Sequence, residues 1–203
     1  MNRSADGNPA APHAAHHAEL LRLARDTIAH HLATGGLLAY KPVHDRLREP
    51  AAVFVTLRVR DRRDDTGKGG ERWEAGDLRG CIGQVEAESP LYLAVQDAAV
   101  KAATTDPRFY PVRLDELANL VIEISVLSPM RPVESLNSIV IGQDGLLIVG
   151  NHRRGLLLPE VPLAYGWGRE EFVRALCHKA GLPEDAWPGH AWLYAFTTES
   201  FEE

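Results

Sequence analysis

The pattern of hydrophobic and polar positions divides the chain into segments with two different periods. Apolar residues at every third or fourth position predict helices over 16–34, 91–105 and 169–180. Alternating or continuous apolar runs predict strands over 51–60, 78–86, 119–127 and 192–198, and a hairpin built from 146–149 and 155–159. This order, with hairpin-type connections, favours an α+β fold over a doubly wound parallel sheet. Strands followed by a helix occur twice, over 51–105 and 119–181, which indicates two related halves.

Two stretches lack any hydrophobic period. Residues 1–15 carry Gly, Pro, Asn, Ala and His, and we expect a disordered tail there. The segment 61–77 is densely charged and rich in glycine, so it predicts a long exposed insertion between two strands, mobile over 61–75. We therefore expect one domain over 16–203, with two subdomains and one charged insertion.

Composition excludes several classes of protein. The chain has 203 residues, of which 45% are hydrophobic, so it is long and apolar enough to bury a core. No apolar run approaches the roughly 18 residues of a membrane span, and the first residues lack the apolar region of a signal peptide. Two cysteines fit a reducing cytoplasm. A net charge of −6 argues against nonspecific nucleic-acid binding.

The hexapeptide at 78–83, LRGCIG, is the strongest candidate site. In an extended strand Arg79 and Cys81 share one face, and an adjacent arginine favours the thiolate and lowers the pKa of a cysteine. Gly80 and Gly83 predict a close backbone approach by a ligand or by another element of the fold. A buried, inert cysteine with glycines in a bulge is the alternative.

Three further side chains extend this candidate site. Glu123 lies in an apolar strand and predicts either a general base or a structural ion pair with Arg79 or Arg108. Arg108, in the turn that follows the second helix, has the reach to bind a carboxylate or phosphate. His152 lies in a basic loop that suits either an anionic ligand or plain solvation.

Several kinds of site are not expected. The histidines at 13, 16, 17, 30 and 31 have no cysteine or carboxylate at a metal-ligand spacing, so no metal is predicted. The chain has no G-x-S-x-G elbow, Walker loop or G-x-G-x-x-G motif, and no cofactor is predicted. Cys177 falls beside the apolar stripe of the last helix, where we expect core packing.

Several motifs together resemble one known family. LRGCIG, a helix ending in AATTDPRFYPV, then ELANLVIEISVLSP, DGLLIV, GLLLPEV and KAGLPEDAW follow the pattern of the AMMECR-domain family over about 20–201. Bacterial members are called AmmeMemoRadiSam system protein A. The resemblance implies two β-rich, helix-bearing halves around a continuous, barrel-like, mainly antiparallel sheet, with a cleft that holds the hexapeptide. It also implies a Memo-like protein and a radical SAM enzyme as partners.

Two functions remain open at this point. In the first, the protein is a cysteine-dependent, ligand-handling enzyme component, with Cys81 as nucleophile or redox centre, Arg79 as activator and Glu123 as base. In the second, it is a binding or accessory subunit that presents a small molecule or peptide, or docks a partner protein, without doing chemistry.

Overall fold

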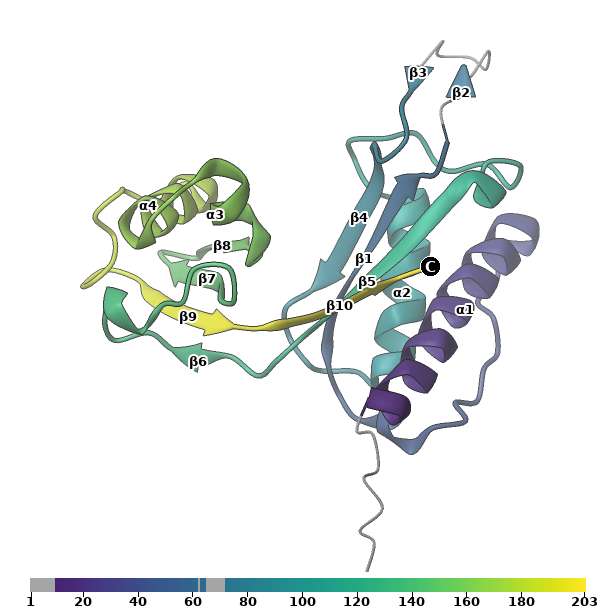
Figure 1. Cartoon of the computed structure of the whole chain (residues 1–203), viewed down its shortest axis with the longest axis horizontal. Coiled ribbons are helices and arrows are strands. Elements are labelled where there is room, and N and C mark those ends of the chain that lie inside the picture. The colour runs from purple at the N-terminus through teal and green to yellow at the C-terminus, as the bar shows by residue number, and fades with distance from the viewer. Residues whose placement is uncertain (1–9, 62, 65–71) are drawn as a thin grey trace, which may run out of the picture. The chain divides into compact units, whose positions relative to one another are not determined.

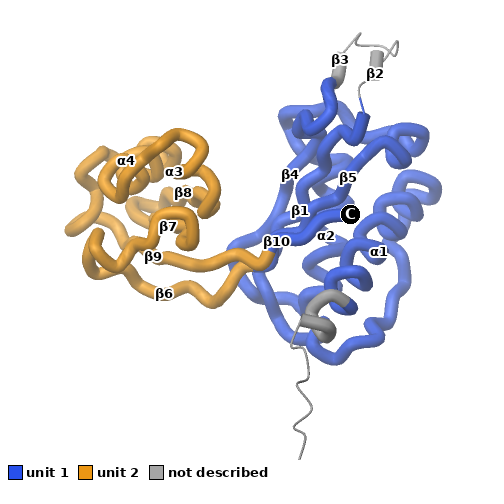
Figure 2. Tube along the Cα trace, in the orientation of Figure 1, with its two compact units in different colours: residues 1–126, 200–203 blue, residues 127–199 orange. Residues whose placement is uncertain are grey.

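The computed structural model describes residues 10–61, 63–64 and 72–203, and divides them between two compact units (Figures 1 and 2). Unit 1 comprises 1–126 and 200–203, and unit 2 comprises 127–199. The elements centred on unit 1 are α1 (Ala10–Thr34), η1 (Asp45–Arg48), β1 (Ala52–Val59), β2 (Arg63–Asp64), β3 (Arg72–Trp73), β4 (Leu78–Gln84), α2 (Leu91–Thr104), η2 (Leu117–Asn119), β5 (Leu120–Leu127) and β10 (Thr198–Glu202). Those of unit 2 are β6 (Arg131–Pro132), η3 (Leu136–Ser138), β7 (Gly145–Gly150), β8 (Arg153–Leu157), α3 (Glu160–Tyr165), α4 (Arg169–Ala180) and β9 (Trp192–Phe196).

The sheet of unit 1 is antiparallel, with strand order β10-β5-β1-β4. Residues 78–86 and 119–127 thus contribute strands to one sheet, as predicted. One face of the sheet packs under α1 and α2, through fully buried Val53, Val55 and Leu57 of β1. Side chains alternate along a strand, so the intervening residues point to the opposite face. We call that opposite face, which carries Thr56, Arg58 and their neighbours on β4 and β5, the open face.

The first helix starts earlier than predicted. It begins at Ala10 rather than at His16, so the predicted disordered tail is wrong for 10–15. The segment is rich in alanine, the best helix former. Pro12 lies in the first turn, where the backbone N–H has no partner within a helix, so the proline costs no hydrogen bond there. Residues 1–9 of the predicted tail lie outside the described residues.

The charged insertion is partly structured. Strands β2 and β3 pair through Arg63 with Trp73 and Asp64 with Arg72, which extends the β1–β4 connection as a short hairpin. Asp61 and residues 74–76 are exposed, as predicted. The mobility predicted for the rest of the insertion falls largely on residue 62 and residues 65–71, outside the described residues.

Unit 2 has its own sheet and its own core. The strand order is β6-β9-β7-β8, and Phe172 and Leu176 of α4 pack on Leu146 and Ile148 of β7. Gly181 ends α4 in a left-handed conformation, φ 67°, as the sequence predicts for a glycine cap. A two-residue turn of positive φ joins β7 and β8.

The two units repeat one plan. In unit 1 the chain runs β1, β4, α2, β5, and β5 lies on the other side of β1 from β4. In unit 2 it runs β7, β8, α4, β9, and β9 lies on the other side of β7 from β8. Both units thus share one order of strands and helix, although β5, predicted to open the second half, belongs almost entirely to unit 1.

The prediction of a continuous barrel-like sheet is wrong, because the main strands form two separate four-stranded sheets. Each sheet ends in its own edge strands, β10 and β4 in unit 1 and β6 and β8 in unit 2. Each covers a separate hydrophobic core with its own helices, so neither sheet needs to close on itself to bury apolar surface. Among the described residues, no helix is both long and apolar enough to span a bilayer.

Candidate functional site

Cys81 lies on edge strand β4, directly opposite Thr56 of β1. Both side chains belong to the open face, and the Thr56 hydroxyl donates a hydrogen bond to Cys81 Sγ at 3.2 Å. The cysteine is partly exposed. Its thiol thus occupies a fixed position on the face of the sheet that α1 and α2 leave uncovered.

The backbone of Cys81 is held by two side chains from the segment after α2. The Cys81 N–H donates to Asp106 Oδ2 at 2.8 Å, and Arg108 Nη2 donates to the Cys81 carbonyl at 3.3 Å. An edge strand normally leaves such groups unpaired. The two side chains therefore take the place of a neighbouring strand at this one residue.

Asp106 and Arg108 form a tight ion pair. Arg108 donates from Nε to Oδ1 at 3.0 Å and from Nη2 to Oδ2 at 2.7 Å, and its backbone N–H also donates to Oδ1. These bonds and the Cys81 N–H lower the pKa of Asp106 to about 2, although its burial opposes the shift. The pKa of Arg108 is raised, mainly by Asp106, and its interaction with the Cys81 side chain adds to the effect. Arg108 is therefore held by Asp106 and by the backbone of Cys81.

Arg79 has a structural role that the sequence did not reveal. The β1–β4 register shifts between Leu57 and Arg58, which leaves Arg79 without a partner residue on β1. Such a bulge changes the direction of the side chain. The Arg79 side chain is almost fully buried; it bonds to Glu116 from Nε at 3.1 Å and to the Tyr110 carbonyl at 2.9 Å. Arg79 thus anchors the segment that follows α2, and this differs from the predicted activation of Cys81.

The two glycines of the hexapeptide accommodate other parts of the protein. A Cβ atom at Gly80 would lie 2.1 Å from the Ala102 carbonyl oxygen of α2. One at Gly83 would lie 2.4 Å from the Phe54 ring, which covers it on the open face. Of the two predicted causes of close approach, ligand or neighbouring element, the structure shows the second. Gly80 and Gly83 are packing residues here.

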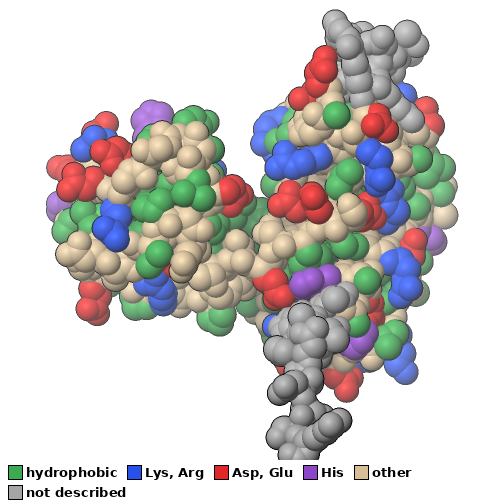
Figure 3. Space-filling model, in the orientation of Figure 1, with side chains coloured by type: hydrophobic (Ala, Val, Ile, Leu, Met, Phe, Trp, Pro, Cys, Tyr) green, Lys and Arg blue, Asp and Glu red, His purple; other side chains and the backbone are tan. Residues whose placement is uncertain are grey.

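Glu123 shares the open face with Cys81, as predicted, but its partner differs from both candidates. Arg58 Nε lies 3.4 Å from Glu123 Oε2, and Arg58 lies two residues beyond Thr56 on β1. Neither Arg79 nor Arg108 is the partner in this pair. Acidic and basic side chains also lie beside one another elsewhere on the visible surface of unit 1 (Figure 3).

Sequence reasoning missed three members of this cluster: Thr56, Arg58 and Asp106. The first two alternate along the strand predicted over 51–60, so their shared face was readable from the sequence. Their position beside Cys81 depends on strand register, which no local pattern supplies. No local pattern marks Asp106 as a partner of Cys81, because the two residues lie 25 positions apart in the chain.

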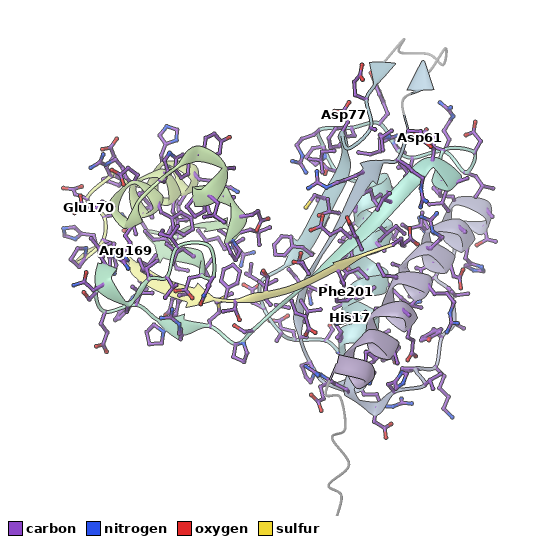
Figure 4. All side chains as sticks on the ribbon, in the orientation of Figure 1. His17, Asp61, Asp77, Arg169, Glu170 and Phe201 are labelled. Carbon is purple, nitrogen blue, oxygen red and sulfur yellow. The ribbon has the colours of Figure 1, made fainter. Side chains whose placement is uncertain are left out.

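The remaining candidates lie elsewhere. His152 belongs to unit 2, in the turn between β7 and β8, where it is exposed with φ 58°. Cys177 is fully buried in the core of unit 2, and this burial raises the pKa of its thiol. His17 stacks on Phe201 of β10 at a centroid distance of 3.9 Å (Figure 4). Within the described part of the chain, no group of three or more potential ligands is placed to hold a metal ion.

Two contacts of the cluster concern catalysis at Cys81. A nucleophilic thiol needs a base within hydrogen-bond reach, and Glu123 instead contacts Arg58. An oxyanion hole needs backbone N–H groups aimed at the reacting atom, and the Cys81 N–H is committed to Asp106. What the cluster does offer is a positioned thiol, a hydroxyl and two arginines.

Comparison with known proteins places the chain in a family. The AMMECR1 family model matches residues 21–201. Protein MK0488 of Methanopyrus kandleri is 41% identical over 192 residues, covering 91% of this chain and 86% of that protein. Protein MJ0810 of Methanocaldococcus jannaschii is 40% identical over 190 residues, covering 90% and 88%. The crystal structure of uncharacterized protein PH0010 from Pyrococcus horikoshii matches with a TM-score of 0.77 and 41% identity, covering 91% of this chain and 89% of that one.

Proposed function

This chain belongs to the AMMECR1 family, and its resemblance to that family implies that it acts together with partner proteins. We propose that it is a ligand-handling component whose binding site is the open face around Cys81. The observation that supports this is the position of the thiol. Cys81 is partly exposed on the side of the sheet opposite α1 and α2, and its backbone is fixed by the buried Asp106 carboxylate. A buried, rigid support beneath a partly exposed thiol is typical of a binding site held on a scaffold.

The role we favour is binding without turnover, the second of the two functions that the sequence left open. The cysteine-dependent enzyme is the competing proposal. It requires Glu123 to act on Cys81 as a base, whereas this carboxylate is engaged by Arg58. Replacing Glu123 with Gln separates the two. We expect the pH profile of thiol labelling at Cys81 to stay unchanged in Glu123→Gln, and a shifted profile would favour the enzyme.

The partners and the setting are part of the same proposal. We propose that the protein works in the cytoplasm with a Memo-like protein and a radical SAM enzyme. The family resemblance alone supports these points. Co-expression of the three proteins followed by affinity purification tests the association; a stable complex supports it, and separate elution at matched concentrations opposes it.

The main test compares the two cysteines of the native chain. Native protein is treated with iodoacetamide at neutral pH, and adducts are mapped by mass spectrometry over time. We expect Cys81 to react about a hundredfold faster than Cys177, because labelling the buried thiol requires a local opening that costs about 3 kcal/mol. Denaturation should abolish the difference. Equal resistance of both thiols in the native protein would show that Cys81 is structural.

A further inference from the structure

Resting on the proposed function, we infer that the Cys81 site takes a ligand with an anionic group, a carboxylate or a phosphate. The first observation is the orientation of the Asp106–Arg108 pair. Asp106 is 4% exposed and accepts four hydrogen bonds, from the Cys81 N–H and from three N–H groups of Arg108. The Arg108 side chain is 52% exposed. The pair therefore buries its negative end and presents its positive end to solvent.

Arg108 also has donors to spare. Its Nε and Nη2 bind Asp106 and the Cys81 carbonyl, while its Nη1 makes no hydrogen bond to any described residue. The planar guanidinium is already oriented by two bonds to one carboxylate, so little further side-chain entropy is lost when Nη1 binds a second anion. That second anion would lie close to Cys81, because the Arg108 guanidinium is within 3.3 Å of the Cys81 carbonyl oxygen.

A second arginine, Arg58, lies on β1, the strand next to that of Cys81. Arg58 follows Thr56 by two residues on β1, about 7 Å along the strand, and its side chain points to the same face. It donates from Nε to Glu123 and from Nη1 to the Gly76 carbonyl, and its Nη2 makes no hydrogen bond to a described residue. Its side chain is 43% exposed, against 26% for Glu123. Cys81 thus has one arginine bonded to its backbone and another on the neighbouring strand, and each has a guanidinium nitrogen that makes no hydrogen bond to a described residue.

The positive charge of the two arginines near Cys81 is opposite in sign to the net charge of the whole chain. The net charge is −6, which disfavours the approach of anions in general. Any preference for an anionic reagent at Cys81 must therefore come from groups close to the thiol. Labelling reagents that differ only in charge measure such a preference directly.

The experiment compares iodoacetate with iodoacetamide at Cys81. Both transfer a two-carbon group to the thiolate with loss of iodide, but only iodoacetate carries a carboxylate. The rate ratio of the two reagents is measured by mass spectrometry in native protein at low ionic strength, and the same cysteine in urea-denatured protein is the reference. We expect the rate with iodoacetate divided by the rate with iodoacetamide to be about ten times higher in the native than in the denatured protein. This ratio should fall as salt is added.

Variants assign the preference to the two arginines. Arg58→Gln should lower the native ratio about threefold, and Arg108→Lys, which keeps a charge over Asp106, should lower it through loss of the planar donor edge. The matched control is Arg174→Gln, an exposed arginine of unit 2 that pairs with Glu184, which should leave the ratio unchanged. An excess of acetate or of phosphate should slow labelling at Cys81, and the more effective of the two identifies the anionic group.

The outcomes separate this inference from the proposed function. If both reagents label Cys81 and the native ratio equals the denatured one, the anion preference is overturned while the ligand-facing thiol stands. If neither reagent labels Cys81 in the native protein, the proposed function itself fails.

Discussion

Strand β4 of unit 1 and strand β8 of unit 2 occupy the same place in their sheets, at an edge and beside the first strand of a hairpin. Each carries a glycine that faces a helix. Gly80 lies against Ala102 near the end of α2, and Gly155 lies against Ala180 at the end of α4. Gly80 pairs with Leu57 and Gly155 with Ile148, both fully buried. The glycine-to-helix contact is thus part of the repeated scaffold.

The next residue along each strand marks the difference between the units. Cys81 follows Gly80 and pairs with Thr56, whereas Leu156 follows Gly155 and pairs with Leu147. Equivalent positions therefore hold a polar pair in unit 1 and an apolar pair in unit 2. Function is expected where one copy of a scaffold departs from its packing role. This contrast directs attention to Cys81 more strongly than the glycines beside it do.

The largest expected effect tests the shared glycine position. Gly80→Ala should lower the free energy of unfolding by about 3 kcal/mol, because its Cβ would lie 2.1 Å from a backbone oxygen that has no freedom to move away. Gly155→Ala should cost only about 1 kcal/mol, since its nearest neighbour, the Ala180 Cβ, lies 2.9 Å away. Denaturant unfolding of both variants checks the order. A larger loss for Gly155→Ala would break the comparison.

Each unit also has one buried aspartate bonded to an arginine, and the next prediction compares these. Asp106→Asn should lower the free energy of unfolding by about 3 kcal/mol. The native side chain accepts four hydrogen bonds, and the substitution leaves Arg108 without its counter-charge. Asp144→Asn should cost about 2 kcal/mol, since Asp144 accepts from Arg131 and from the Val140 N–H alone. Equilibrium unfolding at neutral pH measures both losses. Equal losses would show that the interactions of Asp106 beneath Cys81 are no stronger than those of Asp144 in unit 2.

The pH dependence of the free energy of unfolding should report the same interactions of the Asp106 carboxylate with Arg108 and the Cys81 N–H. The pKa of Asp106 is about 2 in the folded protein and about 3.8 as a free side chain, so its ionised form stabilises the fold. This contribution, about 2 kcal/mol, is fully present above about pH 5 and is lost as the pH falls towards 2. The difference in unfolding free energy between the native chain and Asp106→Asn should therefore narrow over that range. A constant difference would contradict the ion pair.

The smallest effect is expected at the hairpin connections. Unit 2 joins β7 to β8 with the two residues Asn151 and His152, whereas unit 1 carries β2, β3 and the segment between them. Replacing 65–71 with Asn-Gly would join the paired residues Asp64 and Arg72 by the same kind of turn. We expect the melting temperature to change by less than about 2 °C, because loop length weakly affects stability. A larger drop would indicate that the segment packs on unit 1.

Local patterns in the sequence predicted the elements better than the contacts between them. Alternation identified the strands that became β4 and β5, and the cap at Gly181 ended α4 where expected. The same alternation correctly placed Cys81 and Glu123 on one face. It failed for Arg79, because a single bulge changes the direction of a side chain and no periodicity announces a bulge.

Tertiary pairing accounts for the other differences. The partner of Glu123 proved to be Arg58, since long-range register decides which arginine lies opposite a carboxylate. Sheet closure is likewise decided by which edge strands meet, and the two separate cores of this chain leave four edges. The hydrogen bond between Asp106 and Cys81 was also not predicted, because a helix and a turn separate the two residues in the chain.

The return of the chain from β9 to β10 makes unit 2 an insertion within the sheet of unit 1. Strands β5 and β10 pair, although nearly all of unit 2 lies between them in sequence. At the crossing, the Ser128 N–H donates to the Thr197 carbonyl and the Thr197 N–H donates to the Ser128 hydroxyl, both at 2.9 Å. Once unit 2 has folded, its two ends are already side by side, and the entropy of closing a long loop no longer opposes the pairing of β10 with β5. A folded unit 2 therefore lowers the entropic cost of adding the last strand of the chain to the sheet that carries Cys81.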